Sequence, residues 1–113
     1  MVTIKGTTIQ ITRGDSASIA VTIYNADGTV YHPAAGDSVR FAVKKNYDDP
    51  QPVILKTIPR DTMRLVLAPS DTKTLEAGQQ RGRYHYDIEL TKTDGTVDTF
   101  IPRADFIVLE EVY

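Results

Sequence analysis

The stretch Arg83-Tyr84-His85-Tyr86-Asp87-Ile88-Glu89-Leu90-Thr91 decides the fold class. Its apolar side chains occupy every second position, and polar side chains fill the positions between them. Because successive side chains of a strand point to opposite faces, this period of two predicts a β-strand with one face in a core. An Asp94-Gly95 turn follows, and the run 97–101 returns along the first strand. The sequence therefore predicts a β-hairpin over residues 83–101.

The same alternation continues in both directions from this hairpin. It predicts further strands at residues 9–12, 19–23, 29–31, 38–45, 53–58, 63–67 and 106–113. Turns rich in Gly, Asp and Pro separate these runs, and a surface loop with two prolines is expected at 46–52. Pro102 is expected to end the strand that begins at residue 97, because proline has no amide proton to donate to a sheet.

One segment, residues 70–76, carries a helical signal. Ser70 or Asp71 can cap the free amides of a short helical turn there, before Gly78 ends it. Roughly seven to nine short strands with one such turn are typical of an antiparallel β-sandwich. The predicted fold class is therefore all-β.

Composition limits the chain to one domain and excludes several kinds of site. The chain has 113 residues, of which 41% are hydrophobic and 25% charged, and this length suffices for a single core over residues 1–113. The absence of cysteine excludes disulfides, thiolate metal sites and a cysteine nucleophile. A net charge of −2 argues against a nucleic acid partner. We expect no membrane partner and synthesis in the cytoplasm, because no apolar run resembles a membrane span or a signal peptide.

The inward faces of the strands are expected to form one hydrophobic core. The alternation predicts its members as Ile19, Val21, Ile23, Val39, Phe41, Val43, Leu65, Tyr86, Ile88, Leu90 and Val108. His85, Asp87 and Glu89 form a row on the outward face, with Arg40 and Lys44 as expected cross-strand partners. The pair of Arg40 and Asp87 is predicted to be exposed and worth no more than about 1 kcal/mol. No metal site is predicted, because one strand face cannot supply enough converging ligands.

Motifs typical of enzymes are absent from the sequence. It contains no G-x-S-x-G elbow, no glycine-rich phosphate loop and no H-E-x-x-H pair, so we expect no catalytic residues and no cofactor. The tripeptide Arg13-Gly14-Asp15 matches a motif that integrins bind, but a Gly-Asp pair between two strands is also explained by turn geometry. An adhesive role for this tripeptide stays open.

The last predicted strand carries the candidate interface. Residues 106–109 are apolar on both faces, whereas a small sandwich covers only one face of an outer strand. We expect Ile107, Leu109 and Tyr113 to face outward on an edge strand and to contact another subunit or protein. The alternative is that the loop 46–52 or the N-terminal residues Val2 and Ile4 cover that face.

Several stretches together resemble a known family. In the second half they are 65–72 (LVLAPSDT), Leu75, Gly78, 84–90 (YHYDIEL) and 94–97 (DGTV). In the first half they are Ile9 to Thr12, Gly14-Asp15, the run ending in Tyr24, Asp27-Gly28, Tyr31, Gly36-Asp37-Ser38 and Val39 to Lys44. This order resembles the small immunoglobulin-like domain at the N-terminus of upper baseplate proteins of tailed phages of Gram-positive bacteria, and its stand-alone prophage relatives. Residues 79–82 (QQRG) depart from the pattern as an insertion.

The resemblance implies an immunoglobulin-like antiparallel β-sandwich and a non-enzymatic virion structural protein. Such a protein is made in the host cytoplasm, ends in the virion, and docks a tail, baseplate or related appendage through contacts with other virion proteins or further copies of itself. Tyr84 or Tyr86 then resembles the tyrosine of sandwich domains whose hydroxyl bonds to upstream backbone. The alternative function is a carbohydrate-binding or adhesin-type module at a bacterial surface, with Tyr31 and Tyr47 stacking on a sugar.

Overall fold

The computed structural model describes residues 2–5, 8–25, 27–46, 48–78 and 81–111, with 2–5 and 100–103 described by their backbone only. The elements are β1 (Val2–Lys5), β2 (Thr8–Thr12), β3 (Ala17–Ala20), β4 (Ile23–Tyr24), β5 (Val30–Tyr31), β6 (Ser38–Lys44), β7 (Ile54–Ile58), β8 (Arg64–Leu67), α1 (Pro69–Thr72), β9 (Arg83–Thr91) and β10 (Val97–Leu109). Within these ranges no helix has the length and apolar content needed to cross a membrane. The predicted all-β fold class is confirmed.

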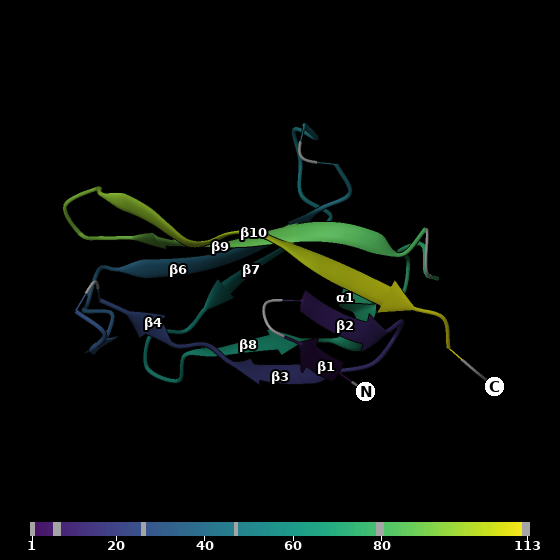
Figure 1. Cartoon of the computed structure of the whole chain (residues 1–113), viewed down its shortest axis with the longest axis horizontal. Helices are drawn as coiled ribbons and strands as arrows, with labels where there is room; N and C mark the ends of the chain where they lie inside the picture. The colour runs from purple at the N-terminus through teal and green to yellow at the C-terminus, as the bar shows by residue number, and fades with distance from the viewer. Residues whose placement is uncertain (1, 6–7, 26, 47, 79–80, 112–113) are drawn as a thin grey trace.

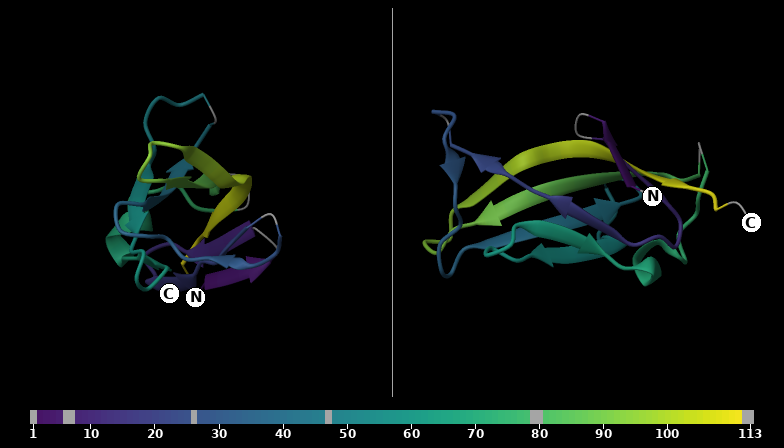
Figure 2. Two further views of the ribbon diagram at one scale, coloured as in Figure 1. Left: turned by 90° about the vertical axis from the view of Figure 1, so that its left-hand side faces the viewer. Right: turned by 90° about the horizontal axis from the view of Figure 1, so that it is seen from below.

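Two layers of strands enclose the core (Figures 1 and 2). Six strands form one sheet in the order β1-β2-β10-β9-β6-β7, and β3 pairs with β8 in the opposing layer. The short strands β4 and β5 form a separate two-stranded ribbon at one end of the molecule (Figure 1). The strands pair in antiparallel fashion except for β2 and β10, which run parallel.

The strand β10 is longer than the sequence predicts, and it is not an edge strand. It runs through Pro102 without a break, because its register with β9 shifts between Thr99 and Ile101 and again between Ile101 and Ala104. Such irregularities leave backbone groups out of the ladder, so a residue without an amide proton is tolerated there. The strand lies between β2 and β9, and the expectation of an edge strand at 106–113 is therefore wrong.

The predicted core residues are buried, apart from Val21, which is partly buried and packs against the others. Three aromatic rings form the centre of this core. The centroid of Phe41 lies 5.3 Å from that of Tyr86 and 6.0 Å from that of Phe106, distances at which tilted rings attract one another. Phe106, which is not among the predicted core residues, is 0% exposed.

The short helix α1 ends earlier than the predicted 70–76, and Asp71 rather than Ser70 fixes its start. The Asp71 carboxylate accepts a hydrogen bond from the Ala68 amide at 2.7 Å. After the helix, the Tyr84 hydroxyl donates a hydrogen bond to the Glu76 carbonyl at 3.2 Å. This bond is the upstream backbone contact that the sequence predicts for Tyr84 or Tyr86.

Gly82 allows the chain between α1 and β9 to lie directly against β10. A Cβ atom at this position would lie 2.0 Å from the Val108 carbonyl oxygen, a distance that no side chain can adopt. The Val108 amide donates to the Gly82 carbonyl at 2.8 Å, and the Gly78 amide donates to the Val108 carbonyl at 2.9 Å. Glycine is thus required here by the close backbone approach.

Replacement of Phe41 by alanine tests the position of the core. Phe41 is 0% exposed and contacts two other aromatic rings, so Phe41→Ala should lower the free energy of unfolding by about 3–5 kcal/mol, measured by urea denaturation. The control Leu55→Ala removes a side chain that is 56% exposed and should change this energy by no more than about 0.5 kcal/mol. Equal effects of the two changes would contradict the assignment of the faces.

Candidate functional site

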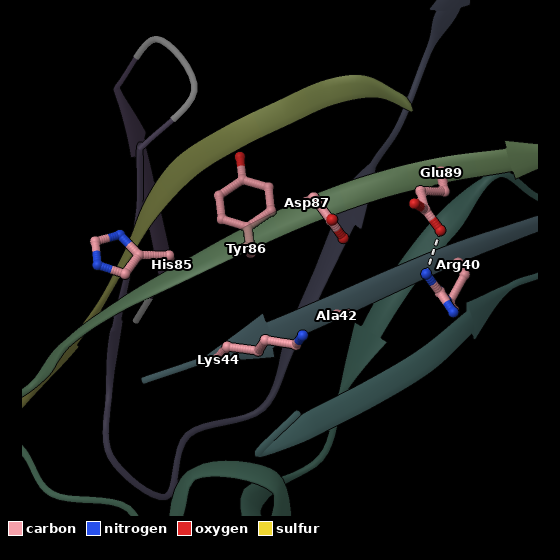
Figure 3. Close-up of a pocket in the computed structure, with 7 residues that line it drawn as sticks. All are labelled: Arg40, Ala42, Lys44, His85, Tyr86, Asp87 and Glu89. Atoms are coloured by element: carbon pink, nitrogen blue, oxygen red, sulfur yellow. Dashed lines mark hydrogen bonds and ion pairs between the residues drawn. The ribbon is translucent and has the colours of Figure 1, made fainter. Parts of the chain in front are cut away.

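The outer face of the six-stranded sheet carries a cleft of about 250 Å³, which we call the outer cleft (Figure 3). Strand β6 supplies Arg40, Ala42 and Lys44, and strand β9 supplies His85, Asp87 and Glu89. The register pairs them across the two strands as Arg40 with Glu89, Ala42 with Asp87, and Lys44 with His85. Since Ala42 is the smallest of these residues, a hollow lies between the longer charged side chains.

The charged side chains of the outer cleft pair differently from the prediction. Arg40 forms its ion pair with Glu89, the residue directly opposite it, rather than with Asp87. The predicted adjacency of the two strands and a cross-strand partner for Arg40 in the row His85, Asp87 and Glu89 are confirmed, but the predicted partner Asp87 is wrong, because the register places Ala42 opposite Asp87. The Nδ1 atom of His85 lies 3.6 Å from a carboxylate oxygen of Asp105 on β10, so this ring turns away from Asp87 (Figure 3).

The Asp87 carboxylate differs from the other charged groups of the cleft in that one of its oxygens is buried without a hydrogen-bond partner. Among the described side chains, its Oδ1 is a buried polar atom with no hydrogen-bond partner. Burial raises the pKa of the Asp87 carboxyl, and the negative charge of Glu89 raises it further, while Arg40 and Lys44 act in the opposite direction. The neighbouring positive charges thus stabilise the ionised Asp87 carboxylate only in part.

The chemistry available to the outer cleft is recognition by charge and hydrogen bonding. Within the described ranges, no three His, Asp or Glu side chains come together in a way that could hold a metal ion. The ion pair of Arg40 with Glu89 crosses from β6 to β9, and an exposed pair of this kind contributes at most about 1 kcal/mol. The face therefore presents an ordered, mixed-charge surface.

The candidate interface residues do not form an exposed row. Ile107 is 8% exposed and lies between Gln10 of β2 and Arg83 of β9, while Leu109 is half-buried. Tyr113 lies outside the described residues, as do the side chains of Val2 and Ile4, which were expected as alternative cover. Phe106 and Val108 belong to the core cluster, whereas Ile107 does not belong to it and is buried on the outward face beside Gln10 and Arg83.

The candidate sugar-stacking residues are placed only in part, since Tyr47 lies outside the described residues. Tyr31 lines a second hollow of about 250 Å³, which we call the end groove, together with Ile23, Tyr24, Asn25, Leu90, Lys92 and Asp98. The Tyr31 hydroxyl donates a hydrogen bond to Asp37 at 2.5 Å, and the Lys92 ammonium lies 5.4 Å from the centre of the Tyr31 ring. The groove lies between the β4–β5 ribbon and the β9–β10 hairpin.

Asp37 fixes one wall of the end groove, a role that the sequence patterns do not reveal. Its carboxylate accepts hydrogen bonds from the Tyr31 hydroxyl, the Ala34 amide, and both the amide and the hydroxyl of Thr93. These donors, first among them Tyr31, lower the pKa of Asp37 to about 2. The sequence indicates only a turn at Gly36-Asp37. The contact with Thr93 could not be predicted from local patterns, because Thr93 lies 56 residues away along the chain.

The tripeptide Arg13-Gly14-Asp15 is built into the fold. The Arg13 guanidinium binds the Glu111 carboxylate at 2.9 Å and the Leu75 carbonyl at 3.2 Å. Gly14 has a φ of +84°, as the predicted turn requires. The Arg13 side chain thus links the β2–β3 turn to Leu75 and Glu111, which are distant from it in the sequence. This role is structural.

Replacement of Asp87 by asparagine tests the strain in the outer cleft. Folding raises the Asp87 pKa above its ordinary value of 3.8, so the ionised carboxylate destabilises the fold above the raised pKa. Asp87→Asn should therefore increase the urea midpoint at pH 7. This advantage should shrink as the pH falls through the raised pKa and vanish below about 3.8. A variant that is less stable than the wild type at pH 7 would show that the carboxylate has a compensating partner.

Comparisons with protein-family models, curated proteins and solved structures find no match for the chain.

Proposed function

We propose that this protein is a non-enzymatic structural component of a tailed-phage or prophage virion, with an immunoglobulin-like sandwich that docks onto its neighbours through protein surfaces. The sequence resemblance is the origin of this proposal. Two structural features support the immunoglobulin-like part of it. The first is the hydrogen bond of the Tyr84 hydroxyl, near the start of the late strand β9, to the upstream Glu76 carbonyl, and the second is the arrangement of the strands in two packed layers.

The observation that carries the docking function is the position of β7 as the terminal strand of the six-stranded sheet. This strand ends the six-stranded sheet, and among the described residues it pairs only with β6. Unpaired backbone groups along an edge strand are a template for a strand of another chain. Leu55 and Val53 add apolar side chains that are 56% and 43% exposed, so this edge combines backbone hydrogen bonding with apolar surface.

The β7 edge adjoins the outer cleft. Leu55 lies directly opposite Ala42, and Ala42 in turn lies opposite Asp87. A partner strand added beside β7 would place its outward-facing side chains beside Leu55, with β7 between it and the charged side chains of β6. This arrangement suits a protein partner and replaces the interface predicted from the sequence on β10.

Introduction of a charge at Leu55 tests this proposal in assembled particles. In the phage or prophage host, Leu55→Lys should lower the amount of this chain in purified particles at least about tenfold, because an unpaired ammonium would be buried at the contact. The amount is measured by quantitative mass spectrometry of the particles. The variant itself should fold normally, since Leu55 is exposed.

A matched control separates the β7 edge from exposed apolar surface in general. Val66 on β8 is 60% exposed and belongs to the opposing layer, so Val66→Lys should leave incorporation unchanged. Absence of the wild-type chain from the particles would refute the virion function. Equal incorporation of Leu55→Lys and wild type would refute only the role of the β7 edge.

A further inference from the structure

The end groove has features of a binding site that the docking function does not use. Its lining residues come from the β4–β5 ribbon, from the end of β9 and the residue after it, and from β10. Ile23 and Leu90, both buried core residues, form its apolar floor, and polar side chains surround them. An apolar hollow with a few converging polar groups is the usual form of a small-molecule site.

The two tyrosines supply aromatic surface at this groove. Tyr24 is 65% exposed and lines the groove, so its ring is accessible to a ligand there. Tyr31 is held by its hydrogen bond to Asp37, so its ring is fixed before any ligand arrives. A fixed ring loses little conformational entropy on binding, and its flat apolar face suits the C–H face of a sugar ring.

The charges of the groove select the class of ligand. The Lys92 ammonium and an Asp98 carboxylate oxygen lie 3.7 Å apart, so the two charges largely offset each other and favour neither an anion nor a cation. The Lys92 ammonium offers hydrogen-bond donors, and the Asp98 carboxylate beside it offers acceptors. Neighbouring hydroxyl groups match such a pair, because each hydroxyl can both donate and accept a hydrogen bond.

The volume limits the size of the ligand. About 250 Å³ is below the ~300–1,000 Å³ of pockets that enclose drug-sized molecules, so the groove accommodates one ring rather than a long chain. We propose that the end groove binds a single neutral hexopyranose unit, with Tyr24 and Tyr31 contacting the ring and Lys92 and Asp98 contacting its hydroxyls. This site is independent of the β7 edge, and it does not require that the protein belongs to a virion.

Titration by two-dimensional ¹H–¹⁵N NMR tests the proposal on the full chain. The probes are the methyl glycosides of glucose, galactose and N-acetylglucosamine, and cyclohexanol serves as a ring that lacks the hydroxyl pattern. At least one glycoside should cause saturable shifts in the amides of residues 23–25, 31, 90–92 and 98, with a millimolar dissociation constant. Cyclohexanol should bind more weakly.

Three variants locate the binding. Tyr24→Ala and Asp98→Asn should each weaken binding of the responding glycoside at least about fivefold, and the same spectra report whether each variant is folded. Val97→Ala is the matched control, because Val97 is 54% exposed and, as the residue before Asp98 on β10, points to the other face. The proposal is overturned if none of the three glycosides causes saturable shifts, if the shifts lie outside the groove, or if the folded Tyr24 and Asp98 variants bind as tightly as the wild type.

Discussion

The pairing of β10 on both of its sides is the constraint on which the rest of the structure depends. Residues 106–109 run parallel to β2, while β10 also pairs along its length with β9 in the antiparallel direction. This places the N-terminal strands and the C-terminal hairpin in one sheet. Phe106 and Val108 are fully buried and Ile107 nearly so, which explains why this part of the sequence is apolar at consecutive positions.

Local patterns account for the part of the fold that the sequence predicts well. The alternation in 83–91 and 38–45 placed β9 and β6 correctly, and it assigned Phe41 and Ile88 to the core, because strand periodicity depends only on neighbouring residues. The pairing of β2 with β10 could not be predicted in this way. It joins residues almost a hundred positions apart, and the apolar pattern of 106–109 fits both an interior strand and an exposed interface.

In the candidate sites, too, the sequence predicts which residues share one strand face but not which distant residues they contact. The row of His85, Asp87 and Glu89 was visible in the sequence, but the partner of Arg40 depends on a register that only the paired strands fix. The end groove combines side chains from two hairpins that are distant in the sequence. Asp37 holds the Tyr31 hydroxyl at this groove, but the sequence indicates only a turn at this position. Its carboxylate accepts hydrogen bonds from Tyr31 and from the distant Thr93, and no local pattern reveals that combination.

The two proposed surfaces lie on different parts of the molecule and share no described lining residue. The β7 edge is one lateral edge of the six-stranded sheet. The end groove is lined by residues of the β4–β5 ribbon and of the β9–β10 hairpin. Both depend on a rigid six-stranded sheet, since β9 contributes to the outer cleft beside the edge and also to the floor of the groove.

Native-state hydrogen exchange at residues 106–108 tests the central position of β10 most directly. An interior strand exposes its amides only when the whole domain unfolds, so the free energy of exchange at these residues should equal the free energy of unfolding measured with urea. Exchange through local opening, at a free energy well below the global value, is the behaviour of an edge strand. That result would contradict the interior position of β10 and the dependence of the sheet on it.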